Sequence, residues 1–147
     1  NAKFIFALRN PYDCVLSCFI QQFTLNPAMK NFLTIESSAL LYDLVMKLWK
    51  VYNKKFSINC HFIKYEDTVK NFEHTTKDLF KYLELNWTDE AKNFFMNARK
   101  RIDISTPSHS QVISPLYTGS VDRWKNYEKQ FEKVKKLLDP WVNEFNF

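Results

Sequence analysis

The sequence predicts a helix-rich α/β fold with about two parallel strands. One apolar run lies at residues 3–9, a second β-favouring run lies at 58–66, and segments with helical periodicity follow each of them. The resulting order, β-α-α-β-α-α, is typical of α/β proteins. The length of 147 residues suits one ordinary domain, so we expect residues 1–147 to form a single domain.

The first strand and the two helices after it follow from local signals. Residues 3–9 are nearly all apolar and end in a charge, as in a buried strand of a parallel sheet. Asn10 suits an N-cap and Pro11 a first helical position, which predicts a helix over 11–23. A second helix is predicted over 36–53. The expected core positions are Leu16, Phe19, Ile20 and Phe23 in the first helix, and Leu40, Leu41, Leu44, Val45, Leu48 and Trp49 in the second.

The second strand, at 58–66, leads directly into further helices. We expect one helix over 67–85 and another through residue 98, with Thr88 as its N-cap. The expected core face of the first of these is Val69, Phe72, Leu79, Phe80 and Leu83. Residues 102–117 are rich in Ser, Thr, Pro and His without a sustained period, which is typical of a long binding loop. A final helix is predicted over 127–145, with a bend at Pro140.

The composition narrows the class of protein. Hydrophobic residues make up 46% and aromatic residues 17%, which is enough for a packed core and excludes a disordered chain. The 21 Lys and Arg against 16 Asp and Glu give a net charge of +5, which favours anionic ligands but also fits solvated surface lysines. Basic residues alternate with acidic ones and the aromatics have core spacing, so we expect no nucleic-acid partner. No run approaches the ~20 apolar residues of a membrane span.

Cysteine and glycine usage exclude several kinds of site. Cys14, Cys18 and Cys60 cannot all pair with one another and lack zinc-ligand spacing, so we expect reduced thiols, a cytoplasmic location and no metal. Cys14 and Cys18 lie one turn apart on an apolar helix and are interpreted as small buried hydrophobes. Gly119 is the single glycine in the sequence, and P-loops and dinucleotide fingerprints need several.

The residues after the first strand suggest an anion site. Arg9 lies at the carboxyl end of that strand, where open α/β sheets bind ligands, and its planar guanidinium can hold a phosphate with two hydrogen bonds. Ser17 lies about two turns into the helix, on the face shared with Asn10 and Asp13, so its hydroxyl could contact the same anion. The alternative is an Arg9 that pairs with Asp13, beside an ordinary helix serine.

Three segments resemble the sulfotransferases that use 3′-phosphoadenosine 5′-phosphosulfate (PAPS). Residues 3–19, KFIFALRNPYDCVLSCF, resemble the segment in which a strand-end Arg and a Ser eight positions later hold the 3′-phosphate, and Arg9 and Ser17 match these two. Residues 64–73, KYEDTVKNFE, resemble a segment in which a Tyr, here Tyr65, approaches the nucleoside. Residues 105–131 resemble the nucleotide loop of the protein-tyrosine and the bacterial tetratricopeptide-repeat sulfotransferases. The matching positions there are Ser108, Gln111, Val112, Pro115, Arg123 and Trp124.

This resemblance implies a three-layer P-loop-transferase fold and transfer of a sulfonate from PAPS to a hydroxyl or amine of an unidentified acceptor, without a metal. It implies that the cofactor is bound by Arg9, Ser17, Tyr65, Ser108, Gln111 and Arg123. It assigns no catalytic residue: His61 and His74 are expected to be structural or solvent-facing, and His109 lies in the binding loop but is not expected to be the base.

Departures from the family pattern predict an incomplete site. The glycine-containing loop for the 5′-phosphosulfate would precede Asn1, so the chain is expected to be the C-terminal portion of a sulfotransferase domain and inactive alone. Gln21 stands where the protein-tyrosine branch has a further basic residue. The sheet edge and apolar surface left uncovered would favour a homodimer. The alternative function is a non-catalytic anion-binding or protein-interaction module.

Overall fold

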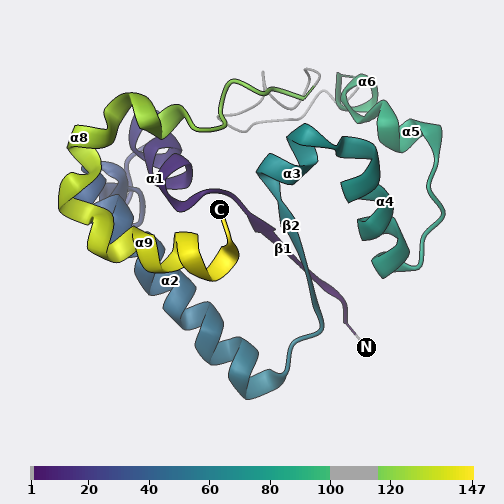
Figure 1. Ribbon diagram of the computed structural model, residues 1–147, viewed down its shortest axis with the longest axis horizontal. Helices are drawn as coiled ribbons and strands as arrows, with labels where there is room; N and C mark the ends of the chain where they lie inside the picture. Colours follow the sequence, from purple (N-terminus) through teal and green to yellow (C-terminus); the bar gives the residue numbers. More distant parts are fainter. Residues whose placement is uncertain (1, 100–115) are drawn as a thin grey trace. The chain divides into compact units, whose positions relative to one another are not determined.

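The computed structural model describes residues 2–99 and 116–147 and divides the chain into two compact units. The first unit consists of Asn1–Leu8 and Cys60–Gly119, and the second of Arg9–Asn59 and Ser120–Phe147. Figure 1 gives the labels of the helices and strands that are used below. The described elements are helix-rich with two parallel strands in one sheet, so the predicted α/β class is confirmed.

The first unit contains the sheet. Strand β1 (Phe4–Leu8) pairs in parallel with β2 (Cys60–Lys64), with Phe4 opposite Cys60 and Leu8 opposite Lys64. Both predicted strands are therefore confirmed. The expectation that the first is buried holds at Leu8, which is 5% exposed, but Phe4 and Ile5 are about half exposed. Within the described residues β1 has one neighbouring strand, and a two-stranded sheet covers few of its own side chains.

Between β2 and residue 99 this unit has four short helices, where two longer ones were expected. Helices α3 (Tyr65–Lys70) and α4 (Phe72–Leu83) are separated at Asn71, which has non-helical dihedral angles (φ −147°, ψ 64°). Helices α5 (Asp89–Lys92) and α6 (Phe94–Arg99) are separated at Asn93. The predictions of continuous helices over 67–85 and to residue 98 are therefore wrong at these two asparagines, a residue type that is unfavourable inside helices. The predicted core face of 67–85 is partly buried at each of its five positions.

The second unit begins with two helices whose starts were predicted. In α1 (Pro11–Ile20) Pro11 is the first residue, and the Asn10 side chain accepts a hydrogen bond from the Tyr12 N–H at 3.0 Å. A 3₁₀ turn, η1 (Met29–Phe32), precedes α2 (Ile35–Phe56). The Thr34 hydroxyl caps α2 by accepting from the Ser37 N–H at 3.1 Å. Both predicted helices are confirmed, with α1 ending three residues earlier than expected.

The final segment is less regular than predicted. It comprises η2 (Arg123–Tyr127), α8 (Glu128–Phe131), η3 (Glu132–Val134) and α9 (Lys135–Phe145). The changes between 3₁₀ and α geometry precede α9, whereas α9 continues through Pro140, where a bend was expected. None of the helices in the described residues is long and apolar enough to cross a membrane.

The core of the second unit is built from α1, α2, α8, η3 and α9. Its fully buried members include Val15, Ala39, Phe131 and Leu138. The Phe131 ring packs edge-on against Tyr12 and Trp124, at centroid distances of 5.4 and 6.2 Å. The terminal segment is thereby attached to the first helix by aromatic contacts and by area removed from water.

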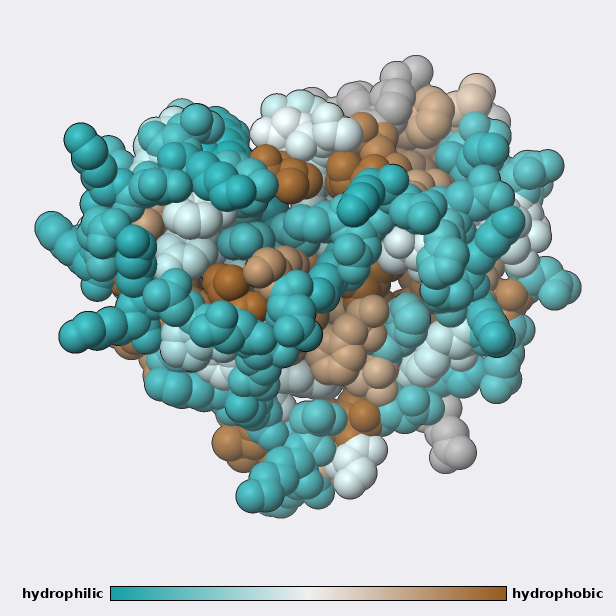
Figure 2. Space-filling view, viewed as in Figure 1, coloured by the Kyte–Doolittle hydropathy of each residue, from teal (hydrophilic) through white to brown (hydrophobic). Residues whose placement is uncertain are grey.

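Several predicted core positions lie on the surface instead. Phe19 and Ile20 of α1 are 39% and 42% exposed, and four predicted core residues of α2 are about half exposed: Leu40, Leu44, Val45 and Leu48. Helix α2 instead buries Ser38, Ala39, Asp43 and Met46 against its neighbours. The small Ser38 and Ala39 allow close helix packing, so the buried face of α2 is turned away from the Leu-rich stripe. Hydrophobic side chains accordingly reach the surface between hydrophilic ones (Figure 2).

Candidate anion-binding site

The Arg9 side chain bridges helix α1 and the segment before η2. Its Nη1 donates to the Ser17 hydroxyl at 2.7 Å, and its Nη2 donates to the Ser120 backbone carbonyl at 2.7 Å. Arg9 directly follows β1, and Ser17 lies eight residues further along, in the second turn of α1. The side chain must therefore fold back along the start of the helix. The structure thus places the two residues together, as their spacing predicts.

The turn at 120–124 is fixed by Asp13 of α1. The Asp13 side chain is 1% exposed, and its two oxygens accept the backbone N–H groups of Asp122 at 2.7 Å and Trp124 at 2.8 Å. Asp122 has a left-handed conformation, with φ 58°. The Trp124 ring stacks on Tyr12 at 4.3 Å between centroids. This turn carries Arg123, whose side chain is exposed.

Asp13 has a different role from the ion pair with Arg9 that was considered as an alternative. Its oxygens are occupied by backbone N–H groups, while Arg9 donates to Ser17 and Ser120. Burial raises the pKa of Asp13, and the hydrogen bond from Trp124, the charge of Arg9 and the hydrogen bond from Asp122 oppose that rise. Arg9 therefore acts on Asp13 through its charge.

The two cysteines of α1 lie next to this arrangement. Cys14 and Cys18 are free thiols that share a hydrogen bond within the helix. That bond and burial raise the pKa of Cys14, whereas the bond from Cys14 and the charge of Arg9 lower the pKa of Cys18. The interpretation of both as plain buried hydrophobes thus overlooked the polarity that Arg9 gives to this helix face.

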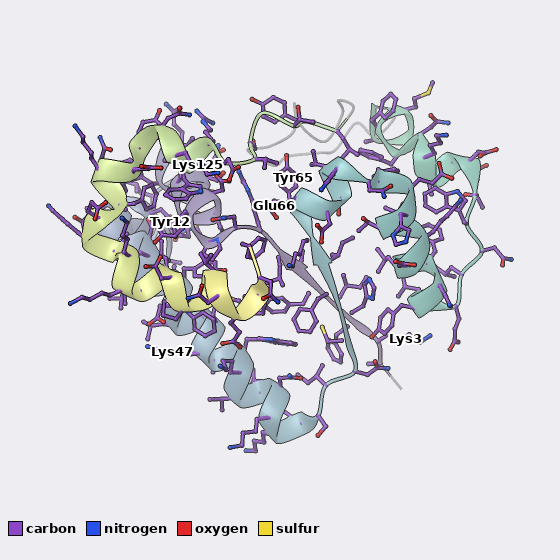
Figure 3. All side chains as sticks on the ribbon, viewed as in Figure 1. Lys3, Tyr12, Lys47, Tyr65, Glu66 and Lys125 are labelled. Carbon is purple, nitrogen blue, oxygen red and sulfur yellow. The ribbon has the colours of Figure 1, made fainter. Side chains whose placement is uncertain are left out.

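Tyr65 belongs to the other unit. It is the first residue of α3, directly after β2, and its hydroxyl donates to the backbone carbonyl of Tyr117 (Figure 3). The hydroxyl therefore helps to fix the segment before Gly119. Of the remaining predicted cofactor residues, Ser108 and Gln111 lie outside the described residues, as does His109.

A hollow of about 570 Å³ lies on the first unit, along β2, α3 and α4. Its lining includes His61, His74, Lys64 and Asp67. His61 stacks on Tyr82, and the His74 Nδ1 lies 3.3 Å from the Asp78 carboxylate. Across residues 2–99 and 116–147, no group of three or more His, Cys, Asp and Glu side chains is placed to hold a metal ion.

Two participants in the Arg9 arrangement were missed from the sequence. Asp13 was considered only as a partner for Arg9, although a charged residue among the apolar positions of α1 is itself a sign of a buried acceptor. Ser120 contributes through its backbone carbonyl, which no side-chain pattern can indicate. Trp124, one of the positions that match the family segment, packs on Tyr12.

Comparison with known proteins agrees with the sulfotransferase resemblance of residues 3–19 and 64–73, which lie within the matched range. The sequence profile of the sulfotransferase family matches residues 1–89, more than half of the chain. The chain belongs to the sulfotransferase family. An uncharacterized protein of Aquifex aeolicus (strain VF5) is 26% identical over an alignment of 157 positions. The alignment covers 99% of this chain and 20% of that protein. The chain thus spans about a fifth of the length of the curated relative that it matches.

Proposed function

We propose that the protein is a sulfotransferase whose sulfonate donor is PAPS, and that Arg9 and Ser17 hold the donor's 3′-phosphate. The observation that carries this proposal is the 2.7 Å contact between the Arg9 guanidinium and the Ser17 hydroxyl. The contact lies at the carboxyl end of a parallel strand and within the segment that matches the sulfotransferase family. This places a fixed positive charge and a hydroxyl together where open α/β sheets bind ligands.

The donor set fits a phosphate. The Arg9 guanidinium carries a permanent positive charge and N–H donors in a planar fork, and its contacts with Ser17 and Ser120 hold that fork beside α1. Because the Ser17 oxygen accepts from Arg9, its own hydrogen can be donated to a phosphate oxygen. A phosphate group beside α1 would therefore receive charge-assisted hydrogen bonds from Arg9 and a further one from Ser17.

The proposed reaction is an in-line transfer of a sulfonate group. The acceptor oxygen or nitrogen forms a bond to the sulfur, the bond between sulfur and the 5′-phosphate oxygen breaks, and 3′-phosphoadenosine 5′-phosphate (PAP) leaves. The acceptor proton passes to a base that we do not assign. The residues of this chain contribute by holding and orienting the nucleotide. Tyr65, Ser108, Gln111 and Arg123 are proposed to complete the nucleotide site.

We further propose that the chain is the part of a sulfotransferase domain that binds the 3′-phosphate and nucleoside. The family pattern places the contacts to the 5′-phosphosulfate on a separate glycine-containing loop. Gly119, the one glycine in this sequence, lies elsewhere, two residues after Tyr117, whose backbone carbonyl accepts from the Tyr65 hydroxyl. Transfer activity is therefore expected only in a protein that also contains that loop.

The binding proposal is tested by calorimetric titration with PAP and with AMP, which lacks the 3′-phosphate. We expect PAP to bind more tightly than AMP. Arg9→Ala should lower the affinity for PAP about 10- to 100-fold, because hydrogen bonds to charged groups contribute roughly 1.5–3 kcal/mol. Ser17→Ala should give a smaller loss. Lys136→Ala removes an exposed positive charge from α9 and is the matched control, with PAP affinity within about twofold of the parent.

Equal affinity of a folded sample for PAP and AMP would contradict the proposal. Binding that depends on the 3′-phosphate, without sulfonate transfer by the full-length protein, would instead favour the non-catalytic anion-binding module. The transfer assay uses radiolabelled PAPS and a panel of hydroxyl and amine acceptors.

A further inference from the structure

Asp13 is the most deeply buried charged side chain of the described residues, at 1% exposure. A carboxylate in such a place is costly unless its oxygens are hydrogen-bonded. Both are: Oδ2 accepts from the Asp122 N–H and Oδ1 from the Trp124 N–H, across a sequence separation of about 110 residues. Asp13 thus fixes a distant turn to the first helix.

The turn requires this support because of its backbone conformation. Asp122 has φ 58°, a left-handed conformation that residues other than glycine adopt at a cost. In this conformation the N–H groups of Asp122 and Trp124, which are separated by one residue, both donate to the Asp13 carboxylate. The Asp13 hydrogen bonds therefore compensate for a conformation that the turn does not favour by itself.

The same turn determines where the Arg9 guanidinium points. The Ser120 carbonyl, two residues before Asp122, accepts from Nη2 at 2.7 Å, while Nη1 reaches Ser17. A guanidinium held at both Nη atoms has one orientation along α1. If the turn moved, the Ser120 carbonyl would move with it and Arg9 would lose one of these two contacts.

We propose that Asp13 is a positioning residue for the anion site: by fixing the turn at 120–124 it holds the Ser120 carbonyl that orients Arg9 toward a 3′-phosphate. This rests on the proposed function of Arg9 and Ser17. Asp13 itself does not contact the ligand, since both of its oxygens face the backbone. Its contribution is selectivity for nucleotides that carry the 3′-phosphate.

The test is the ratio of PAP to AMP affinity in the full-length protein, with the thermal midpoint measured beside it. Asp13→Asn preserves size but presents an amide NH₂ to one of the two N–H donors, so that hydrogen bond is lost. We expect PAP affinity to fall about 10-fold while AMP affinity changes less than about twofold. Asp139→Asn is the matched control, because Asp139 accepts the hydroxyl of Tyr12, the neighbour of Asp13, and does not touch the turn.

A second pair of variants changes the turn from its other side. Asp122→Pro removes the N–H that Asp13 accepts and imposes a negative φ, whereas Asp122→Gly keeps the N–H and favours the left-handed conformation. The Asp122 side chain is exposed, so neither substitution changes the packing of the core, and the thermal midpoint shows whether each variant is folded. This pair tests the inference independently of Asp13→Asn. We expect the proline variant to lower the PAP-to-AMP ratio and the glycine variant to keep it.

The outcomes separate the two proposals. If the parent protein shows no preference for PAP, the proposed function is wrong and this inference is lost with it. If the parent prefers PAP but folded Asp13→Asn and Asp122→Pro keep the parent's ratio, Asp13 is not a positioning residue. A loss of the ratio that Asp139→Asn and Asp122→Gly share would also overturn the inference, because it would show a general effect of stability.

Discussion

The buried hydrogen bond between α2 and α9 allows a quantitative prediction about stability. The Asp43 carboxylate, 5% exposed, accepts the Trp141 indole N–H at 3.0 Å and the Lys47 ammonium at 2.7 Å (Figure 3 labels Lys47). Trp141 is 4% exposed, so water cannot easily replace the acceptor. Removal of the Asp43 side chain should therefore leave an unsatisfied donor in the core.

The magnitude follows from the two contacts. An unsatisfied buried donor costs about 1–3 kcal/mol, and the Lys47 pair adds at most about 1 kcal/mol because the Lys47 side chain is 63% exposed. We therefore expect Asp43→Ala to lower the free energy of unfolding by about 1–4 kcal/mol. Asp43→Asn keeps an oxygen for the indole and loses only the ion pair, so it should cost less than about 1 kcal/mol.

The assay is chemical denaturation followed by far-UV circular dichroism, with the same substitutions repeated in a Trp141→Phe background. That background has no indole donor, so Asp43→Ala should cost about 1–3 kcal/mol less there than in the parent. The reasoning is refuted if Asp43→Ala costs the same in both backgrounds, or if Asp43→Asn is as damaging as Asp43→Ala.

Two further predictions concern the core and the thiols. Phe131 is fully buried between Tyr12 and Trp124, so Phe131→Ala should lower the free energy of unfolding by about 3–5 kcal/mol in the same denaturation assay. Leu44→Ala, at a position 53% exposed, should cost much less. Similar losses for the two variants would contradict the assigned core. The hydrogen bond from Cys14 and the charge of Arg9 lower the pKa of Cys18 to about 7, so alkylation of Cys18 should reach half its maximal rate near that pH. Burial raises the pKa of Cys60, so Cys60 should react only at higher pH. Cys14→Ala should move the Cys18 profile to higher pH, and residue-resolved mass spectrometry showing one shared profile for Cys18 and Cys60 would contradict this.

Features with local causes were predictable from the sequence. The start of α1 depends on Asn10 and Pro11 alone, and both strands were recognised from short apolar runs. The proximity of Arg9 and Ser17 is also local, since a strand-end side chain that folds back along a helix reaches its second turn. Such contacts depend on a few neighbouring dihedral angles, which is why their spacing carried the prediction.

Features that depend on tertiary packing were not predictable. Leu40 and Leu44 have the periodicity of a core stripe, yet α2 buries Ser38 and Ala39. Periodicity shows that a helix has an apolar face, but which face is covered depends on where α1 and α9 lie. The bond from Asp13 to the turn at 120–124 spans most of the chain, so no local pattern indicates it.

The burial of Asp13 also explains how opposite charges can share the start of α1 without weakening an anion site. A carboxylate that paired directly with Arg9 would compete with any phosphate for the guanidinium. In the structure, both oxygens of Asp13 face the N–H groups of Asp122 and Trp124, and the Arg9 Nη atoms face Ser17 and Ser120, which are neutral acceptors. A phosphate is a stronger acceptor than a hydroxyl or a carbonyl, so it can add to these contacts without displacing a carboxylate. In the proposed site the turn therefore has two roles: it orients Arg9, and it engages the nearby buried carboxylate of Asp13.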